Sequence, residues 1–73
     1  MPKLPRISGW QAVRAFEKAG WETSRQRGSH VVLTKPSSIY TLSIPLHQDL
    51  SPGLLRDQIR KSGLTVAEFV ELL

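Results

Sequence analysis

The chain contains two histidines, His30 and His47, and these are the side chains best suited to acid–base chemistry. Imidazole exchanges a proton near neutral pH more readily than other side chains do. His30 follows the pair Gly28-Ser29, and Arg25 and Arg27 are close in sequence, so this group could bind a phosphate and move a proton. On spacing alone, the simpler interpretation of His30 is an ordinary surface histidine. His47 is a loop or packing histidine, or else a second acid–base group or phosphate contact.

Other kinds of catalytic site lack their residues. There is no cysteine, which excludes disulfides, thiolate zinc sites, iron–sulfur clusters and a Cys nucleophile. The six carboxylates are scattered, with no pair at metal-ligand spacing, so a magnesium-dependent nuclease site has no acidic cluster. The five glycines form no phosphate-binding loop, and no Ser/His/Asp set can be inferred. We expect no metal and no cofactor.

The length and charge limit the chain further. Its 73 residues predict one domain over residues 1–73, with a small core that buries about 60% of the unfolded surface. The net charge is +4, and residues 1–35 hold seven Lys and Arg against two acids. This suggests a polyanion partner such as nucleic acid, and solvated surface charge is an equally good interpretation of the charge alone. No signal peptide or membrane span is recognisable, so we expect a cytoplasmic protein.

The N-terminal third predicts one amphipathic helix after an extended lead-in over residues 1–7. Ser8 is a typical N-cap, and Gly20 is placed to end the helix. Between them, apolar residues recur at helical spacing: Trp10, Val13 and Phe16. We expect Trp10, Phe16 and Trp21 in the core rather than as platforms for base stacking.

A three-stranded antiparallel meander should follow. Residues 21–27 and 30–35 are predicted to form a hairpin around the turn Gly28-Ser29. Residues 39–44 predict the third strand, which Pro45 ends. Its alternation places three side chains on one face: Tyr40, Leu42 and Ile44.

Two helices should close the chain. Ser51-Pro52 begins the first and Gly63 ends it. Thr65 and Glu68 form a capping box for the second, whose apolar stripe is Val66, Phe69, Val70 and Leu73. The order αβββαα predicts an α+β two-layer sandwich with helices on one sheet face. If Val31 and Leu33 face the helices, His30 lies on the open face.

Several motifs, in this order, resemble the HicA toxins of HicAB toxin–antitoxin systems over about residues 3 to 72. They are Leu4-Pro5, Ser8-Gly9, Lys18-Ala19-Gly20-Trp21, Arg25-Gln26-Arg27-Gly28-Ser29-His30, Pro45-Leu46-His47 and Ser62-Gly63-Leu64-Thr65. The resemblance implies a fold like the double-stranded RNA-binding domain and a metal-independent endoribonuclease that cleaves mRNA. It implies that a single histidine, His30, is catalytic and that a HicB-like antitoxin covers the site. The family is often rich in Lys and Gly after P-L-H, whereas this chain has Gln48-Asp49-Leu50, which reduces the RNA affinity expected there.

The resulting hypothesis is cleavage by attack of the RNA's own 2′-hydroxyl. His30 would act as general base or acid, leaving a 2′,3′-cyclic phosphate. The expected RNA contacts are Arg25, Arg27, Ser29, Lys35 and His47. Two alternatives remain: a non-catalytic RNA-binding module of the same fold, which would recognise duplex by shape, and a domain whose open sheet face binds protein.

Overall fold

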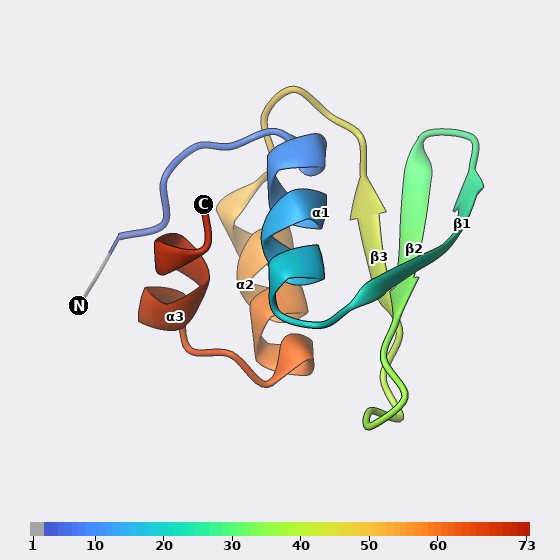
Figure 1. Ribbon diagram of the computed structural model, residues 1–73. Helices are drawn as coiled ribbons and strands as arrows, with labels where there is room; N and C mark the ends of the chain where they lie inside the picture. The colour runs from blue at the N-terminus through green and yellow to red at the C-terminus, as the bar shows by residue number, and fades with distance from the viewer. Residues whose placement is uncertain (1–2) are drawn as a thin grey trace.

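The computed structural model describes residues 3–73 and has the expected element order (Figure 1). The elements are α1 (Gly9–Lys18), β1 (Glu22–Arg27), β2 (His30–Thr34), β3 (Leu42–Pro45), α2 (Pro52–Ser62) and α3 (Val66–Glu71). The strands form one antiparallel sheet in the order β1-β2-β3, and the helices lie together on one side of it. The predicted α+β class and αβββαα order are confirmed, and they are compatible with the double-stranded RNA-binding fold.

Helix α1 begins and ends where its local signals predict. Ser8 Oγ accepts a hydrogen bond from the Gln11 amide at 3.2 Å, and Gln11 Oε1 accepts one from the Ser8 amide at 2.9 Å. Gly20 has φ +99°, a left-handed conformation that favours glycine after a helix. Residues 3–8, before the helix, form neither helix nor strand, and the first two residues of the expected lead-in lie outside the described residues.

One expected core residue of α1 is not in the core. Phe16 and Trp21 are buried as predicted, but 48% of Trp10 is exposed. Trp10 lies about 100° around the helix from the buried Gly9, at the rim of the face that packs on the sheet. Its spacing to Val13 and Phe16 is helical, but the buried face of α1 is centred on other residues and Trp10 falls beyond its edge; the buried residues are Gly9, Ala12, Val13, Ala15 and Phe16.

The β1–β2 hairpin turns at Gly28-Ser29, as predicted, with Arg27 opposite His30. Gly28 has φ +57°, which a two-residue hairpin turn requires. In β2, Val31 and Leu33 are fully buried under the helices, whereas all six residues of β1 are exposed. The hairpin therefore contributes to the core almost entirely through β2.

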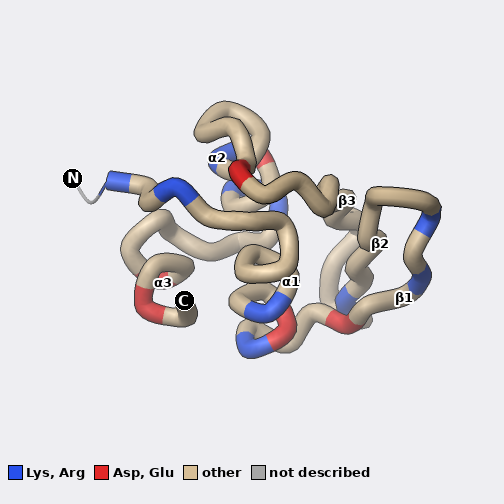
Figure 2. The backbone as a smooth tube through the Cα atoms, turned by 90° about the horizontal axis from the view of Figure 1, so that it is seen from above, with Lys and Arg blue, Asp and Glu red and all other residues tan. Residues whose placement is uncertain are grey.

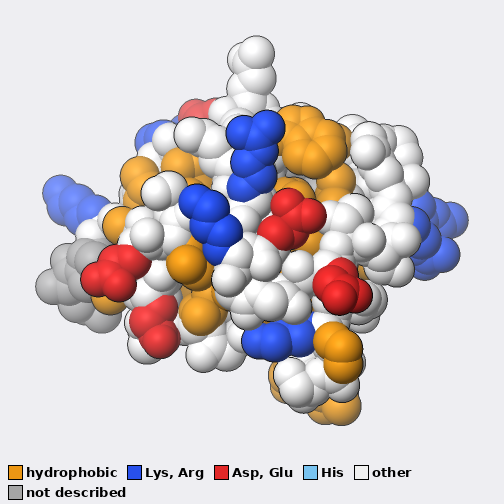
Figure 3. Space-filling view, viewed as in Figure 1, with side chains coloured by type: hydrophobic (Ala, Val, Ile, Leu, Met, Phe, Trp, Pro, Cys, Tyr) orange, Lys and Arg blue, Asp and Glu red, His pale blue; other side chains and the backbone are white. Residues whose placement is uncertain are grey.

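The third strand is shorter than predicted. It begins at Leu42 rather than residue 39, and Ile39 and Tyr40 are 94% and 53% exposed. The turn after β2 occupies these positions: Ser38 donates its amide to the Lys35 carbonyl, and Ser38 Oγ accepts from the Tyr40 amide. Hydrophobic side chains on this loop stand clear of the core at the bottom of Figure 3.

Helices α2 and α3 close the core. Gly63 ends α2 with φ +83°, and the Thr65–Glu68 capping box opens α3. Phe69 of α3 packs against Phe16 of α1 with the two rings tilted by 45° and their centroids 4.9 Å apart. Leu73, expected on the same stripe as Phe69, lies beyond the helix and is 43% exposed. Within residues 3–73, no helix combines the length and apolar character needed to cross a membrane.

Candidate functional site

His30 opens the central strand at the hairpin end of the sheet. It lies opposite Arg27 of β1 and opposite Pro45 of β3. Its neighbour Val31 is completely buried on the helix side, and side chains alternate along a strand. The imidazole of His30 therefore lies on the uncovered face of the sheet, where the sequence predicted it if Val31 and Leu33 pointed inward.

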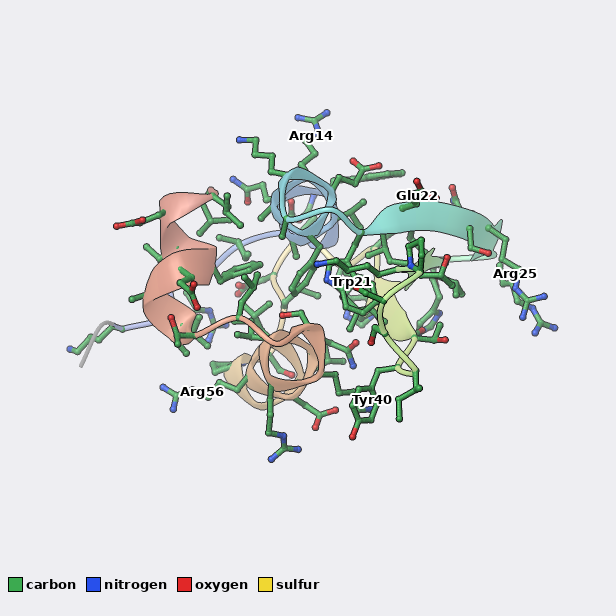
Figure 4. The ribbon with its side chains drawn as sticks, turned by 60° about the horizontal axis from the view of Figure 1, so that its bottom comes forward. Arg14, Trp21, Glu22, Arg25, Tyr40 and Arg56 are labelled. Carbon is green, nitrogen blue, oxygen red and sulfur yellow. The ribbon has the colours of Figure 1, made fainter. Side chains whose placement is uncertain are left out.

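Two guanidinium groups share this face with His30. Residues directly opposite in an antiparallel pair point to the same side, and Arg27 is opposite His30 while Arg25 is opposite Val32. Among residues 3–73, neither arginine makes an ion pair or a side-chain hydrogen bond, and Figure 4 shows Arg25 pointing away from the body of the molecule. Both charges are available to an anionic ligand.

The segment that carries His47 is bound to the same end of the sheet. The Leu46 amide donates to the Ser29 carbonyl at 2.6 Å, and the Gly9 amide donates to the His47 carbonyl at 2.9 Å. Backbone hydrogen bonds thus join three segments: the hairpin turn, residues 46–47 and the start of α1. The side chains of His47 and Ser29 are both exposed. The structure thus places five exposed residues at this end of the sheet, called the His30 cluster below: His30, Arg25, Arg27, Ser29 and His47.

Gly9 belongs to this arrangement, although residue chemistry alone did not single it out. A Cβ at Gly9 would lie 2.1 Å from the Pro45 carbonyl oxygen and 2.9 Å from Leu46 Cα. Only a residue without a side chain lets the helix approach the end of β3 this closely. The signal that could have identified it was the pair Ser8-Gly9 at the predicted helix start.

Lys35 is not part of the cluster. It follows β2 at the end opposite His30, so the length of the strand separates the two residues. Its Nζ donates to the Ala19 carbonyl at 3.1 Å and lies 6.0 Å from the centre of the Trp21 ring. The lysine therefore closes the C-terminal end of α1 and covers a buried tryptophan.

Asp49, two residues after His47, is paired with Arg6. Arg6 Nε lies 3.0 Å from Asp49 Oδ1, and Nη2 lies 2.6 Å from Oδ2. This hydrogen-bonded guanidinium holds the pKa of Asp49 below its ordinary value. The negative charge after His47 is therefore compensated by Arg6.

The cations and acids are unevenly placed around the fold. Figure 2 shows Lys and Arg along β1 at one end of the molecule, with α2 and α3 toward the other end. Figure 3 shows basic side chains projecting at the β1 end. Among residues 3–73, no three His, Cys, Asp or Glu side chains gather in a group that could hold a metal ion. The cluster is thus an imidazole-and-guanidinium surface.

A separate hollow of about 210 Å³ opens on the other flank of α1. Its lining residues are Gln11, Arg14, Lys18, Leu72 and Leu73. Lys18 Nζ closes part of it by donating to the Leu72 carbonyl at 3.0 Å. It shares no residue with the His30 cluster, whose side chains are exposed on the surface rather than set in a hollow.

A protein-family comparison identifies the family of the chain. The model of the HicA toxin of bacterial toxin–antitoxin systems matches residues 9–64. The chain belongs to the HicA toxin family. The match begins at Gly9 and includes both histidines and the hairpin, so it covers every member of the His30 cluster. No curated protein matches the chain. As a HicA toxin, the protein is the toxin of a toxin–antitoxin system and has an antitoxin partner.

Proposed function

We propose that this HicA toxin is a metal-independent endoribonuclease that cleaves mRNA at the His30 end of its sheet. The observation that carries the proposal is the shared face of one imidazole and two unpaired guanidinium groups at the hairpin tip. Such a surface suits a substrate that brings its own nucleophile. RNA does so with the 2′-hydroxyl next to each phosphodiester.

Each group of the cluster has a role in this reaction. His30 acts in proton transfer during attack of the 2′-oxygen, a contribution of about 10²–10⁴ in rate for one such group. Arg25 and Arg27 bind the phosphate and offset the negative charge that builds on it in the transition state. Ser29 forms the turn that sets His30 beside them. Lys35 has no part in it, because its ammonium is engaged at the far end of β2.

The antitoxin has a natural target on the same surface. We propose that a HicB-like partner covers the open face at the hairpin and thereby blocks access of RNA to His30. All six β1 side chains are exposed, and β1 is an edge strand, so the face is accessible to a protein as well as to RNA. The toxin would act in the cytoplasm, where mRNA is present.

Cleavage of purified RNA by the isolated toxin tests the enzymatic proposal. The parent should cut RNA in the presence of EDTA and leave 2′,3′-cyclic phosphate ends. RNA with a 2′-deoxy residue at the cleavage position should stay intact. His30→Ala should lose at least a hundredfold in rate, whereas Arg56→Ala, a change at an exposed residue of α2, should not.

The same assay distinguishes the alternative function. A non-catalytic RNA-binding module would bind RNA in a salt-sensitive way without cutting it, and His30→Ala would bind equally well. Equal cleavage by the parent and His30→Ala would refute the role of His30. Failure to bind RNA even at low salt would favour a pure protein-interaction domain.

A further inference from the structure

We propose that His47 is the second catalytic group of the cleavage reaction. In this assignment His30 removes the proton from the 2′-hydroxyl and His47 protonates the departing 5′-oxygen. The inference rests on the proposed ribonuclease function and adds to it a residue and a direction of proton transfer.

The spacing of the two histidines follows from the strand register. His30 lies opposite Pro45, and the bond from the Leu46 amide to the Ser29 carbonyl carries the pairing one residue beyond the end of β3. His47 is therefore a diagonal neighbour of His30, two residues along the facing segment. Diagonal neighbours in antiparallel pairs are about 7–8 Å apart, close enough for both imidazoles to reach one phosphate.

The two histidines also lie on the same face of the sheet. Ile44 is completely buried and Leu46 packs against the core, so both point toward the helices. Pro45, between them, is opposite His30 and is itself buried, where Gly9 at the start of α1 approaches it. His47 is exposed and follows Pro45, the partner of His30, by two residues, and on this basis we place it on the side of His30. Within residues 3–73, neither imidazole makes a hydrogen bond or an ion pair that would occupy it.

The backbone of His47 is held from two directions. Its carbonyl accepts the Gly9 amide at 2.9 Å, while the preceding Leu46 amide is bound to the hairpin turn. The close approach at Gly9 leaves no room for this segment to move toward the helix. A group fixed in this way loses little freedom when substrate binds, which is a property of efficient catalytic groups.

The reaction balances with these two groups alone. His30 takes the 2′-hydroxyl proton, the 2′-oxygen forms a bond to phosphorus, and the bond from phosphorus to the 5′-oxygen breaks. The electron pair of that bond stays on the 5′-oxygen, which receives a proton from the imidazolium of His47. The products are a 2′,3′-cyclic phosphate and a 5′-hydroxyl, and exchange of protons with water restores both histidines.

A sulfur leaving group tests which histidine is the acid. Two RNA oligonucleotides are compared, one natural and one with a bridging 5′-sulfur at the mapped cleavage position. A thiolate leaves without protonation, so only the base is needed. His47→Ala should lose about 10²-fold or more on the natural RNA and recover to near the parent rate on the sulfur RNA. His30→Ala should remain slow on both.

Each other outcome counts against a defined part of the proposal. Parent-like cleavage of natural RNA by His47→Ala, or an equal loss on both substrates, would overturn catalysis by His47. If the sulfur RNA instead restores the cleavage rate of His30→Ala, the assigned direction of proton transfer is wrong. Thermal unfolding is measured on His47→Ala and on a second variant, His47→Gln, to show whether a loss of cleavage rate comes from misfolding. If His30→Ala matches the parent on both substrates, the proposed function fails rather than this inference alone.

Discussion

Arg6 and Asp49, 43 positions apart, form a bidentate ion pair with a shortest contact of 2.6 Å. Beside it, the Leu50 amide donates to the Ile7 carbonyl at 2.8 Å. Together these contacts fasten the segment before α1 to the loop that follows His47. The pair lies on the surface, so its effect on stability is expected to be modest.

The Arg6–Asp49 pair should make stability depend on acid in a particular direction. The pKa of Asp49 is lowered in the folded protein, so its contribution to stability is fully present above about pH 3.8, the ordinary value, and is lost as pH falls through the folded value. The parent should therefore have a slightly higher Tm than Asp49→Asn at pH 7, with the gap closing near pH 2. Circular dichroism melts between these limits measure it, and a gap that stays constant would contradict the assignment. In Arg6→Gln, adding Asp49→Asn should have little further effect at pH 7.

The two tryptophans should differ sharply in their contribution to stability. Trp21 is 2% exposed, and Figure 4 shows it directed into the fold, so Trp21→Ala should cost about 3–5 kcal/mol. Trp10→Ala should cost about 1 kcal/mol or less, because half of its side chain is already in water. Urea unfolding measures both. Trp21→Phe should retain most of the stability, since the buried Trp21 Nε1 has no hydrogen-bond partner in the described structure.

Substitution of Gly9 should disturb both the fold and the cluster. An added Cβ would overlap the Pro45 carbonyl, so Gly9→Ala should cost about 1–3 kcal/mol and reduce RNA cleavage by displacing residues 45–47. Gly53→Ala is the matched control, because a Cβ there meets nothing within 4 Å and alanine favours helix by about 1 kcal/mol. Denaturant unfolding and cleavage are measured on both. A Gly9→Ala protein as stable as the control would show that the contact is easily relaxed.

The arginines of β1 should set the salt dependence of RNA binding. Arg25→Gln and Arg27→Gln should each lower the slope of log affinity against log salt by about 0.7, the value for one contact to single-stranded phosphate. Uncleavable 2′-deoxy-substituted RNA provides the ligand. Arg56→Gln is the control, since Arg56 lies on α2 on the opposite side from Arg25 in Figure 4. A slope unchanged by the β1 variants, or changed equally by Arg56→Gln, would place RNA elsewhere.

Local chemistry explains which elements were predictable. The capping pairs Ser8–Gln11 and Thr65–Glu68, and the glycine after each of the first two helices, act within a few residues, so their signals can be read along the chain. The third strand was predicted three residues too early because alternation over 39–44 does not show that a turn occupies 38–40. Strand pairing, which depends on distant residues, decided where β3 begins.

The sequence predicted the part of the candidate site that lies within one hairpin, but not the parts that depend on distant residues. Arg25, Arg27 and Ser29 lie beside His30 because they belong to one hairpin, whose turn the sequence indicates. Lys35 is close in sequence but lies at the far end of a strand, where the Ala19 carbonyl binds its ammonium. Proximity along the chain could not reveal that distant partner. The approach of Gly9 to Pro45 likewise depends on how α1 packs, which residue types do not specify.

The exposed edge strand β1 makes the surface of this toxin easy to alter during evolution. Its six side chains fill no space in the core, and the strand is held by its backbone pairing with β2. Substitutions at its positions other than Arg25 and Arg27 can change charge and shape while the buried residues of β2, β3 and the helices remain as they are. If the antitoxin covers this strand as proposed, its contact with the toxin can be altered there without any change to the core.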